Sequence, residues 1–440
     1  MDGYYAFMLV ATALVLMMTV PALALFYGGM TRSKSVLNMM MMSYVAFAVV
    51  AIVFVLWGWS EGWGGDGVGN SNGKLIANPF TMFGLDGVSW GSYVGVLFQL
   101  TFAAITVALI SGAIADRVKL SSWLVFVPIW LTLCYFPVAH NVWGGGWLSS
   151  HWVAQDYAGG TVVHINAGIA GGVLALIIGR RLGFAKEPMR PHNLTLTMIG
   201  AGLLWFGWYG FNVGSIVFVA GDGAEKDTAQ FMTETGVTFM NTTIATCAAM
   251  LAWLLMERIL HGKATSLGAA SGIVAGLVAI TPSCGAVSLV GAIVVGAVAG
   301  AACAAAVGLK FRFGLDDSLD VVGVHLVGGL VGTLLIGFLS TASAPGGING
   351  LFYGGGFTSL GHQTIAALFT IVWTGVLTTV IALLIKVTIG WRVTEEAEVE
   401  GIDSDQHGES AYDLHGGLSG GSSSPTSVLA KSTVTEGVNA

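Results

Sequence analysis

The chain has 440 residues, of which 55% are hydrophobic and only 9% are charged. Since an average soluble domain is about 25% charged, this composition excludes an ordinary soluble globular protein and indicates an all-α polytopic membrane protein. The formal net charge of −7 says little about the membrane part, because many of the acidic residues lie in the tail after Trp391.

Long apolar runs without charge follow one another from the N-terminus, and most approach the roughly 20 residues that cross a bilayer. The first run is not expected to be a cleaved signal peptide, because MDGYYAF lacks a basic region, although ALA at 22–24 leaves cleavage as an alternative. We predict eleven transmembrane helices, at residues 4–27, 37–57, 92–114, 122–140, 158–179, 194–217, 236–256, 266–281, 286–309, 320–340 and 361–386.

Lys and Arg indicate the orientation of these helices, because they are enriched in cytoplasmic connections. They follow the odd-numbered spans, as at Arg32, Arg117 and Arg180, whereas only Lys74 and Lys226 lie in connections of the other parity. We therefore predict that the N-terminus is outside and the C-terminal tail is in the cytoplasm.

The four cysteines of the chain lie in apolar runs and lack the spacing of a metal site. They are interpreted as small buried apolar side chains. We accordingly expect no disulfide, no metal site and no cofactor.

Two stretches of the chain repeat each other: GGTVVHINAGIAG at 159–171 and DVVGVHLVGGLVG at 320–332. Without a gap, His164 aligns with His325, and Asp156 aligns with Asp317. The offset is five spans, and an odd number of spans inserts the second copy upside down. We predict an inverted 5+5 repeat, with repeat one at about 4–190, repeat two at about 193–340 and an extra helix at about 361–390.

The aligned histidines predict a polar pair near mid-depth in the membrane. A single histidine in such a helix is more often a polar side chain satisfied by a neighbouring helix. Two histidines at equivalent repeat positions can instead meet on the pseudo-two-fold axis and hydrogen-bond to each other. We therefore interpret His164 and His325 as residues that line a narrow pore.

Glycines four residues apart recur in several spans, for example Gly272 and Gly276, and Gly296 and Gly300. Small residues at this spacing let membrane helices approach closely. They predict tight helix packing, which suits a narrow pore without proving one.

Nearly the whole chain, from FYGGM (26–30) to HGESAY (407–412), resembles the Amt branch of the Amt/MEP/Rh ammonium transporter family. The motifs that carry the resemblance are FQLTFAAITVALISGAIADR (98–117), HNVWGGGWL (140–148), DYAGGTVVHINAG (156–168), WFGWYGFNVGS (205–215) and DDSLDVVGVHLVGG (316–329). The resemblance implies an eleven-helix subunit with its N-terminus outside. It also implies a homotrimer with one pore in each subunit.

By this resemblance, Trp143 and Ser215 form an outer site that recruits ammonium, with Phe102 beside them. An indole face attracts a compact cation, and a hydroxyl oxygen accepts one of its N–H groups. Phe102 and Phe211 correspond to a stacked phenyl gate at the outer mouth, and Phe98 belongs to the same vestibule. Without the resemblance, Trp143 would be interpreted as a membrane-interface residue, and the three phenylalanines as lipid-facing or core packing residues.

Deeper in the pore, the resemblance gives Trp208 as a lining residue that packs against His164 and His325. It gives Asp156 as the acid near the outer mouth. We expect the Asp156 carboxylate to cap backbone N–H groups around Gly159–Thr161 and to lend negative potential to the recruitment site.

The resemblance implies uptake of ammonium across the plasma membrane, with methylammonium as a further candidate substrate. We expect NH₄⁺ to lose a proton near the gate and NH₃ to pass the histidines, with or without net proton transfer. The alternatives are an ammonium sensor that transports little and a neutral NH₃ gas channel. The connections between the spans contain no nucleophile–base pair and no phosphate-binding loop. We therefore expect neither an enzyme nor a nucleic-acid-binding protein.

The end of the chain differs in composition from the spans. Residues 1–391 form the predicted transmembrane domain, and residues 392–412 match the family's cytoplasmic regulatory tail, which a PII-type signal protein uses for docking. The alternative is a merely solvating acidic tail. Residues 413–440 are rich in Gly, Ser and Thr, which predicts disorder.

Overall fold

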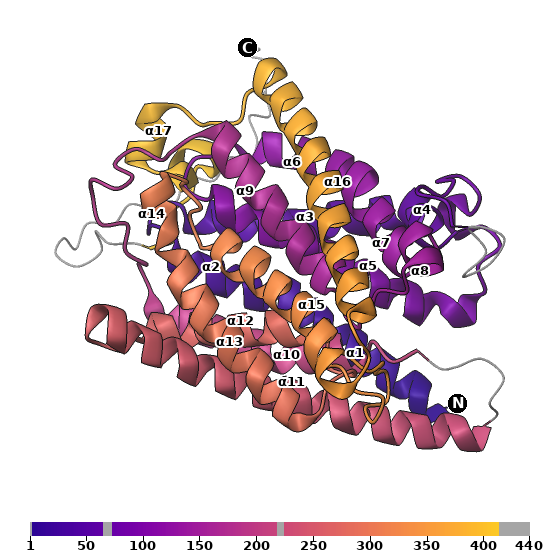
Figure 1. Cartoon of the computed structure of the whole chain (residues 1–440). Coiled ribbons are helices and arrows are strands. Elements are labelled where there is room, and N and C mark those ends of the chain that lie inside the picture. The colour runs from indigo at the N-terminus through magenta and orange to yellow at the C-terminus, as the bar shows by residue number, and fades with distance from the viewer. Residues whose placement is uncertain (1, 65–72, 218–223, 413–440) are drawn as a thin grey trace, which may run out of the picture.

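A computed structural model describes residues 2–64, 73–217 and 224–412, and this part of the chain is helical without a β-strand (Figure 1). The α-helices are α1 (Asp2–Met17), α2 (Ala24–Met30), α3 (Val36–Val53), α4 (Trp59–Trp63), α5 (Tyr93–Ser111), α6 (Leu120–Trp130), α7 (Phe136–Val142), α8 (Trp147–His151), α9 (Asn166–Ile178), α10 (Leu194–Val213), α11 (Ala224–His261), α12 (Ser266–Ile280), α13 (Leu289–Val307), α14 (Leu309–Phe313), α15 (Val327–Leu339), α16 (Thr358–Thr388) and α17 (Glu395–Glu400).

Short helical segments of other types continue or connect these helices. The π-helical segments are η1 (Met18–Leu23), η2 (Phe54–Gly58), η6 (Leu131–Tyr135), η7 (Gly160–Ile165), η8 (Val322–Leu326) and η10 (Asp403–His407). The 3₁₀ turns are η3 (Phe83–Leu85), η4 (Trp90–Ser92), η5 (Gly112–Ile114) and η9 (Leu351–Tyr353). The departure of η1 from regular α-helical geometry has a local cause. Pro21 lies inside the segment, and a proline has no N–H for the regular helical hydrogen bond.

Among the described residues, ten helical stretches are long and apolar enough to cross a membrane, which makes this a multi-pass membrane protein. They are Gly3–Met30, Val36–Trp63, Trp90–Ile114, Leu120–His151, Gly160–Ile178, Leu194–Val213, Thr228–His261, Leu289–Phe313, Val322–Leu339 and Thr358–Thr388. Several extend beyond the predicted limits, because a helix continues past its apolar centre into polar residues.

The eighth predicted span corresponds to α12, whose limits match the predicted range. It has 15 residues, or about 22 Å at 1.5 Å per residue, against roughly 30 Å of hydrocarbon. Residues 270–280 are all buried, so α12 packs inside the protein rather than against lipid. The turn that follows at Thr281 brings the chain back into α13.

Close glycine contacts join α11 to its two neighbours, as the glycine spacing predicted. A Cβ placed on Gly296 of α13 would come 2.1 Å from the carbonyl oxygen of Ala245. On the other side of α11, a Cβ on Gly276 of α12 would lie 2.7 Å from Cα of Thr246. Any larger side chain would therefore force these helices apart.

The two stretches that repeat in sequence adopt the same local structure and run in opposite directions. Each begins with a π-helical segment, η7 or η8, and continues as an α-helix, α9 or α15. A Cβ on Gly168 would lie 2.5 Å from the amide nitrogen of Leu326, and one on Gly329 would lie 3.1 Å from Cβ of His164. Residue numbers rise along one segment and fall along the other, so the crossing is antiparallel.

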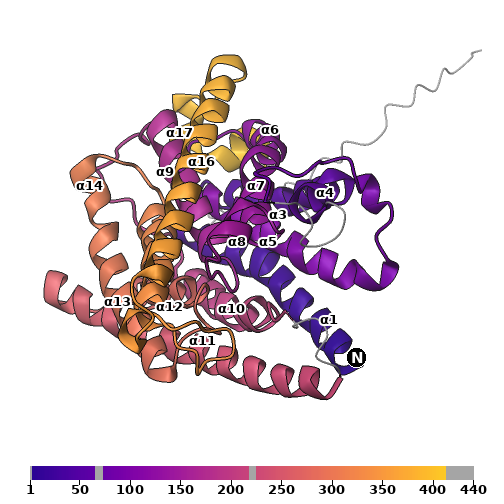
Figure 2. The same ribbon diagram turned by 45° about the vertical axis from the view of Figure 1, so that its right-hand side comes forward.

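The helix outside the repeat, α16, lies beside α9 and α15 (Figures 1 and 2). Its buried polar side chains bond to the first half of the chain. The Thr374 hydroxyl donates to the Asn166 amide oxygen at 2.7 Å, and the Trp130 indole N–H donates to the Thr378 hydroxyl at 3.0 Å. An apolar helix gains little hydrophobic free energy by leaving lipid for a neighbouring helix. Hydrogen bonds between helices therefore help to fix the position of α16.

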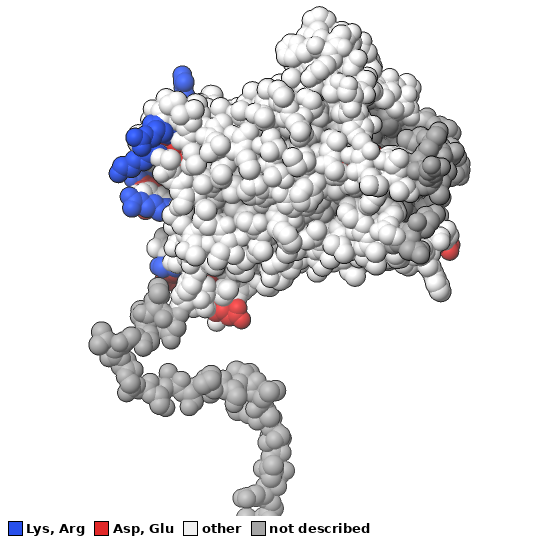
Figure 3. Space-filling view, turned by 90° about the horizontal axis from the view of Figure 1, so that it is seen from below, with Lys and Arg blue, Asp and Glu red and all other residues white. Residues whose placement is uncertain are grey.

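Basic side chains gather at one end of the molecule on the face seen in Figure 3. Arg181, in the basic connection that follows α9, is buried and forms ion pairs with Asp316 at 2.8 Å and with Asp116 at 3.0 Å. Burial alone would raise the pKa of Asp316, but the hydrogen bonds and charge of Arg181 outweigh it and lower that pKa. This cluster ties the end of η5 to the segment that precedes η8.

Residues 391–412 dock on the same end of the bundle. The backbone N–H of Val393 donates to the Arg117 carbonyl at 3.1 Å. The Glu398 carboxylate accepts from the Leu182 N–H at 2.7 Å and pairs with Arg392 at 2.5 Å. Residues 413–440 lie outside the described residues.

A second acid of this tail caps α3. The two oxygens of Asp403 accept hydrogen bonds from the backbone N–H groups of Leu37 at 3.0 Å and Asn38 at 2.8 Å. A carboxylate at a helix N-terminus also meets the positive end of the helix dipole. The tail is therefore held by specific contacts, which argues against a merely solvating role.

Candidate functional site

The predicted histidine pair meets in the centre of the molecule. His164 lies at the end of η7 and His325 in η8, and their side chains are 1% and 3% exposed. Their Nδ1 atoms are 3.3 Å apart, and the rings lie 5.4 Å apart at 26°. One Nδ1 must carry the hydrogen and the other must accept it, so the two rings hold opposite tautomers. Nε2 of His164 is buried and has no partner among the described residues.

Trp208 of α10 packs against this pair, as the resemblance implied. Its ring stacks on His164, with centroids 5.5 Å apart at 22°, and meets Phe211 edge-on at 5.4 Å. The indole N–H donates to the Thr281 hydroxyl at 2.8 Å. Aromatic side chains with a satisfied polar atom suit such a buried position.

The predicted phenyl gate lies next to the histidines. Phe102 of α5 and Phe211 of α10 stack face to face, with centroids 4.0 Å apart at 9°. Both are 1% exposed. Phe98 packs against Phe102 at 4.9 Å, so it joins the same cluster. Since Phe211 also lies 6.3 Å from His164, the aromatic stack and the histidine pair are continuous.

Trp143 contacts one ring of the phenyl pair, and Ser215 bonds to the backbone of the residue that carries the other ring. Trp143 is half-buried and meets Phe102 edge-on at 5.9 Å, which places it next to the pair rather than on the outer surface. The Ser215 hydroxyl donates to the carbonyl oxygen of Phe211 at 2.8 Å. Because its hydrogen is used there, its oxygen remains free to accept a hydrogen bond from a guest.

Asp156 organises the backbone that leads into η7. Its carboxylate accepts hydrogen bonds from the N–H groups of Gly159 (2.8 Å), Gly160 (2.6 Å), Thr161 (2.8 Å) and Val162 (3.2 Å), and from the Thr161 hydroxyl. This is the expected capping arrangement. The carbonyl oxygen of Asp156 accepts the Trp143 indole N–H at 2.8 Å. One residue therefore supports both the outer tryptophan and the first histidine segment.

Its repeat partner, Asp317, caps η8 in a simpler way. The carboxylate accepts from the N–H groups of Val321 at 3.0 Å and Val322 at 2.7 Å. Position 322 is equivalent to Thr161, so the hydroxyl donor of the first copy is replaced by an apolar side chain.

Sequence reasoning missed several polar side chains that surround this site. Thr281, Asn212 and Thr242 form a buried chain of contacts behind Trp208. Asn166, two residues after His164, donates to the Val162 carbonyl of η7 at 3.1 Å. The available signal was a polar residue inside an otherwise apolar run, which becomes informative only when its partner on another helix is known.

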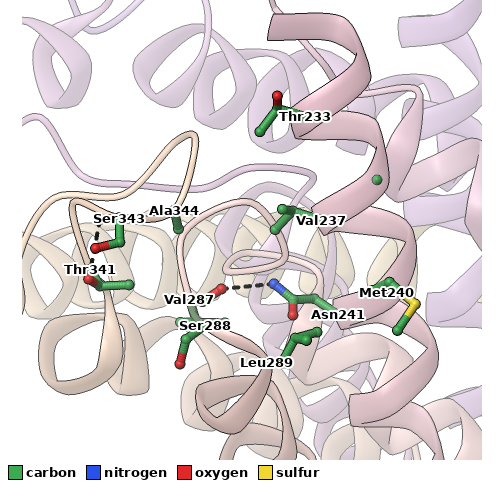
Figure 4. A pocket seen from close by; sticks show the side chains of 11 residues that line it. Thr233, Val237, Met240, Asn241, Val287, Ser288, Leu289, Thr341, Ser343 and Ala344 are labelled. Carbon is green, nitrogen blue, oxygen red and sulfur yellow. Dashed lines mark hydrogen bonds between the residues drawn. The ribbon is translucent and has the colours of Figure 1, made fainter. Parts of the chain in front are cut away.

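A separate cavity of about 460 Å³ lies between α11, the start of α13 and the loop near Thr341 (Figure 4). Apolar side chains such as Val237, Met240 and Leu289 line it. Figure 4 shows the Asn241 amide donating to the Val287 carbonyl, at 2.9 Å, which secures the turn into α13. The cavity contains none of the predicted site residues, so it is distinct from the histidine pair.

The family model of the Ammonium Transporter Family matches residues 6–412, nearly the whole described chain. The chain belongs to the ammonium transporter family. This ammonium transporter family member is 51% identical to an ammonium transporter of Mycobacterium tuberculosis, over 94% of this chain and 90% of the relative. It is 47% identical to one of Aquifex aeolicus, over 94% of both chains. The family consists of transporters and channels rather than enzymes.

Solved structures agree with this assignment. Mep2 of Saccharomyces cerevisiae matches with a TM-score of 0.79 at 32% identity, over 89% of this chain and 88% of that chain. A protein named Sensor Amt Protein matches with a TM-score of 0.81 at 25% identity, over 92% of this chain and 98% of that chain.

Proposed function

We propose that this chain takes up ammonium across the plasma membrane by recruiting NH₄⁺ outside, removing a proton and conducting NH₃ past the histidine pair. The observation that carries the proposal is the buried His164–His325 pair directly behind the stacked phenyl rings. Nε2 of His164, which has no partner in the described part of the chain, is a buried polar atom that a small guest could meet. Membership of the ammonium transporter family supports the choice of guest.

Recruitment takes place above the phenyl pair. The Trp143 ring attracts the cation, and the free lone pair of Ser215 accepts one N–H. The buried carboxylate of Asp156 adds negative potential nearby. Phe102 and Phe211 leave no opening at 4.0 Å, so they must separate for passage.

Deprotonation explains selectivity against potassium. A bare ion is penalised by several kcal/mol in hydrocarbon, whereas NH₃ is neutral. Potassium has no proton to lose, so it cannot enter the apolar part of the pathway, whereas ammonium enters it as NH₃. The proton either follows along the histidines or returns outside, which gives electrogenic uptake or a neutral pathway.

The arrangement in the membrane is part of the same proposal. We place eleven helices across the bilayer, including the short α12, with the N-terminus outside and the tail in the cytoplasm. The basic end in Figure 3 supports this orientation, since cytoplasmic connections are enriched in Lys and Arg. The inverted 5+5 repeat rests on the alignment of 159–171 with 320–332. The homotrimer and a PII-type partner at the tail follow from the family resemblance.

The test is a current measurement on proteoliposomes with the full chain on a solid-supported membrane. Ammonium pulses should evoke a saturable signal, and potassium pulses of the same concentration should evoke none. His164→Ala and His325→Ala should each lower the ammonium response. His261→Ala, which changes an exposed histidine at the end of α11, serves as the matched control.

The outcomes separate the alternatives. Internal alkalinisation without current would indicate neutral NH₃ conduction. Ammonium binding with neither signal would support a sensor, the reading suggested by the resemblance to Sensor Amt Protein. If His164→Ala keeps wild-type flux and selectivity, the role given to the pair is wrong.

A further inference from the structure

The indole of Trp208 is held by a single hydroxyl on another helix. Its N–H donates to Thr281 Oγ1 at 2.8 Å, and Thr281 is the residue that follows the end of α12. Trp208 is 2% exposed and Thr281 is fully buried. Water therefore has no access to replace this hydrogen bond.

The hydroxyl that accepts this bond is itself fixed. Thr281 Oγ1 donates to the Leu277 carbonyl at 2.7 Å and lies 3.2 Å from the Asn212 amide oxygen. The Asn212 amide nitrogen donates to the Thr242 hydroxyl at 3.0 Å. These contacts join α10, α11 and α12, so the Thr281 oxygen has little freedom to move.

The fixed indole in turn presents its face to His164. The two rings are nearly parallel at 22°, and His164 contributes one side of the histidine pair. An indole without its acceptor would turn about its side-chain torsions to find another partner. It would then lose the stack on His164 and direct a polar N–H into the apolar path.

We propose that Thr281 is a positioning residue of the pore: its hydroxyl fixes the Trp208 indole and, through it, the plane of the His164 ring. The inference rests on the proposed function, since it concerns the same pathway. Loss of the Thr281 hydroxyl should therefore change the rate of conduction. The affinity of recruitment should depend instead on Trp143 and Ser215.

The test compares Thr281→Val, which keeps the shape and removes the oxygen, with Thr281→Ser, which keeps the oxygen. Proteoliposomes receive an ammonium concentration series, read by current or by internal alkalinisation. Thr281→Val should lower the maximal flux roughly three- to tenfold, as expected for one lost buried hydrogen bond. Its half-saturation should stay within about twofold of wild type. Thr281→Ser should retain most of the flux.

The matched control is Thr246→Val. Thr246 is a fully buried threonine on the neighbouring helix α11, and its hydroxyl donates to the Thr242 carbonyl at 2.7 Å without contacting Trp208. It should conduct as wild type does. Size-exclusion profiles and thermal unfolding check that every variant is folded.

A double-mutant cycle keeps the inference testable if Thr281→Val folds poorly. In a Trp208→Phe background the indole N–H is absent, so Thr281→Val should cause little further loss of flux. Wild-type flux in Thr281→Val would overturn the inference, as would equal losses in Thr281→Ser or Thr246→Val. A silent wild-type protein would instead count against the proposed function.

Discussion

The two aspartates at equivalent repeat positions provide a quantitative test of the structure. Asp156→Asn replaces one carboxylate oxygen by an NH₂ group, so either two or three of its five donors lose their acceptor. Asp317→Asn leaves one of two donors without an acceptor. At about 1.5–3 kcal/mol per hydrogen bond to a charged group, the first change should cost at least ~3–6 kcal/mol and the second ~1.5–3 kcal/mol.

The measurement is equilibrium unfolding of both variants and the wild type in mixed micelles, followed by tryptophan fluorescence and circular dichroism. Differences between the variants are used, because the two sites share the same micelle and the same reference state. The loss in free energy of unfolding should be about twice as large for Asp156→Asn as for Asp317→Asn. Equal losses, or a larger loss in Asp317→Asn, would refute the donor count as the cause of stability.

Three further expectations follow from contacts at the two ends of the pathway. Trp143→Leu removes a cation–π attraction of about 0.5–2 kcal/mol, so the half-saturation for ammonium should rise roughly 2- to 30-fold in the flux assay; an unchanged value would contradict the recruitment role. Asp316→Asn should lower the free energy of unfolding at neutral pH. The wild-type advantage should shrink as the pH falls from about 4, because the lowered pKa stabilises only the ionised carboxylate beside Arg181. Asp403→Ala should expose the tail to faster limited proteolysis, since α3 loses a cap worth about 0.5–2 kcal/mol, and unchanged protection would argue against this contact as an anchor.

Much of the fold could be predicted from the sequence because lipid imposes simple rules. A charge-free run of about 20 residues has few stable alternatives to a spanning helix, and ten of the predicted spans are confirmed as long apolar helices. The meeting of His164 and His325 could be predicted as well, because equivalent positions in two copies can meet on their shared axis and a buried polar side chain needs a partner. The cap formed by Asp156 could be expected once the resemblance had singled out this acid, because Gly159 lies only a short way further along the chain.

The remaining contacts join residues that are far apart in the sequence. Thr281 and Trp208 are 73 residues apart, and Asp403 and Leu37 are 366 apart. Such pairs leave no periodic pattern, and their partners depend on how the helices pack. The range of α12 was predicted, but its burial inside the protein was not. Hydropathy reports that a segment is apolar but not whether lipid or protein surrounds it.

The two histidine segments share a backbone course but receive different support. The first is held by the five bonds to Asp156 and by Asn166, which α16 fixes through Thr374. The equivalent of Asn166 in the second segment is Val327, an apolar side chain. Because the first segment has more hydrogen bonds, we expect the backbone around His164 to yield less than the backbone around His325. In the proposed pathway, a guest that presses between the rings should therefore displace His325 further than His164, so that one histidine segment keeps its shape while the other yields.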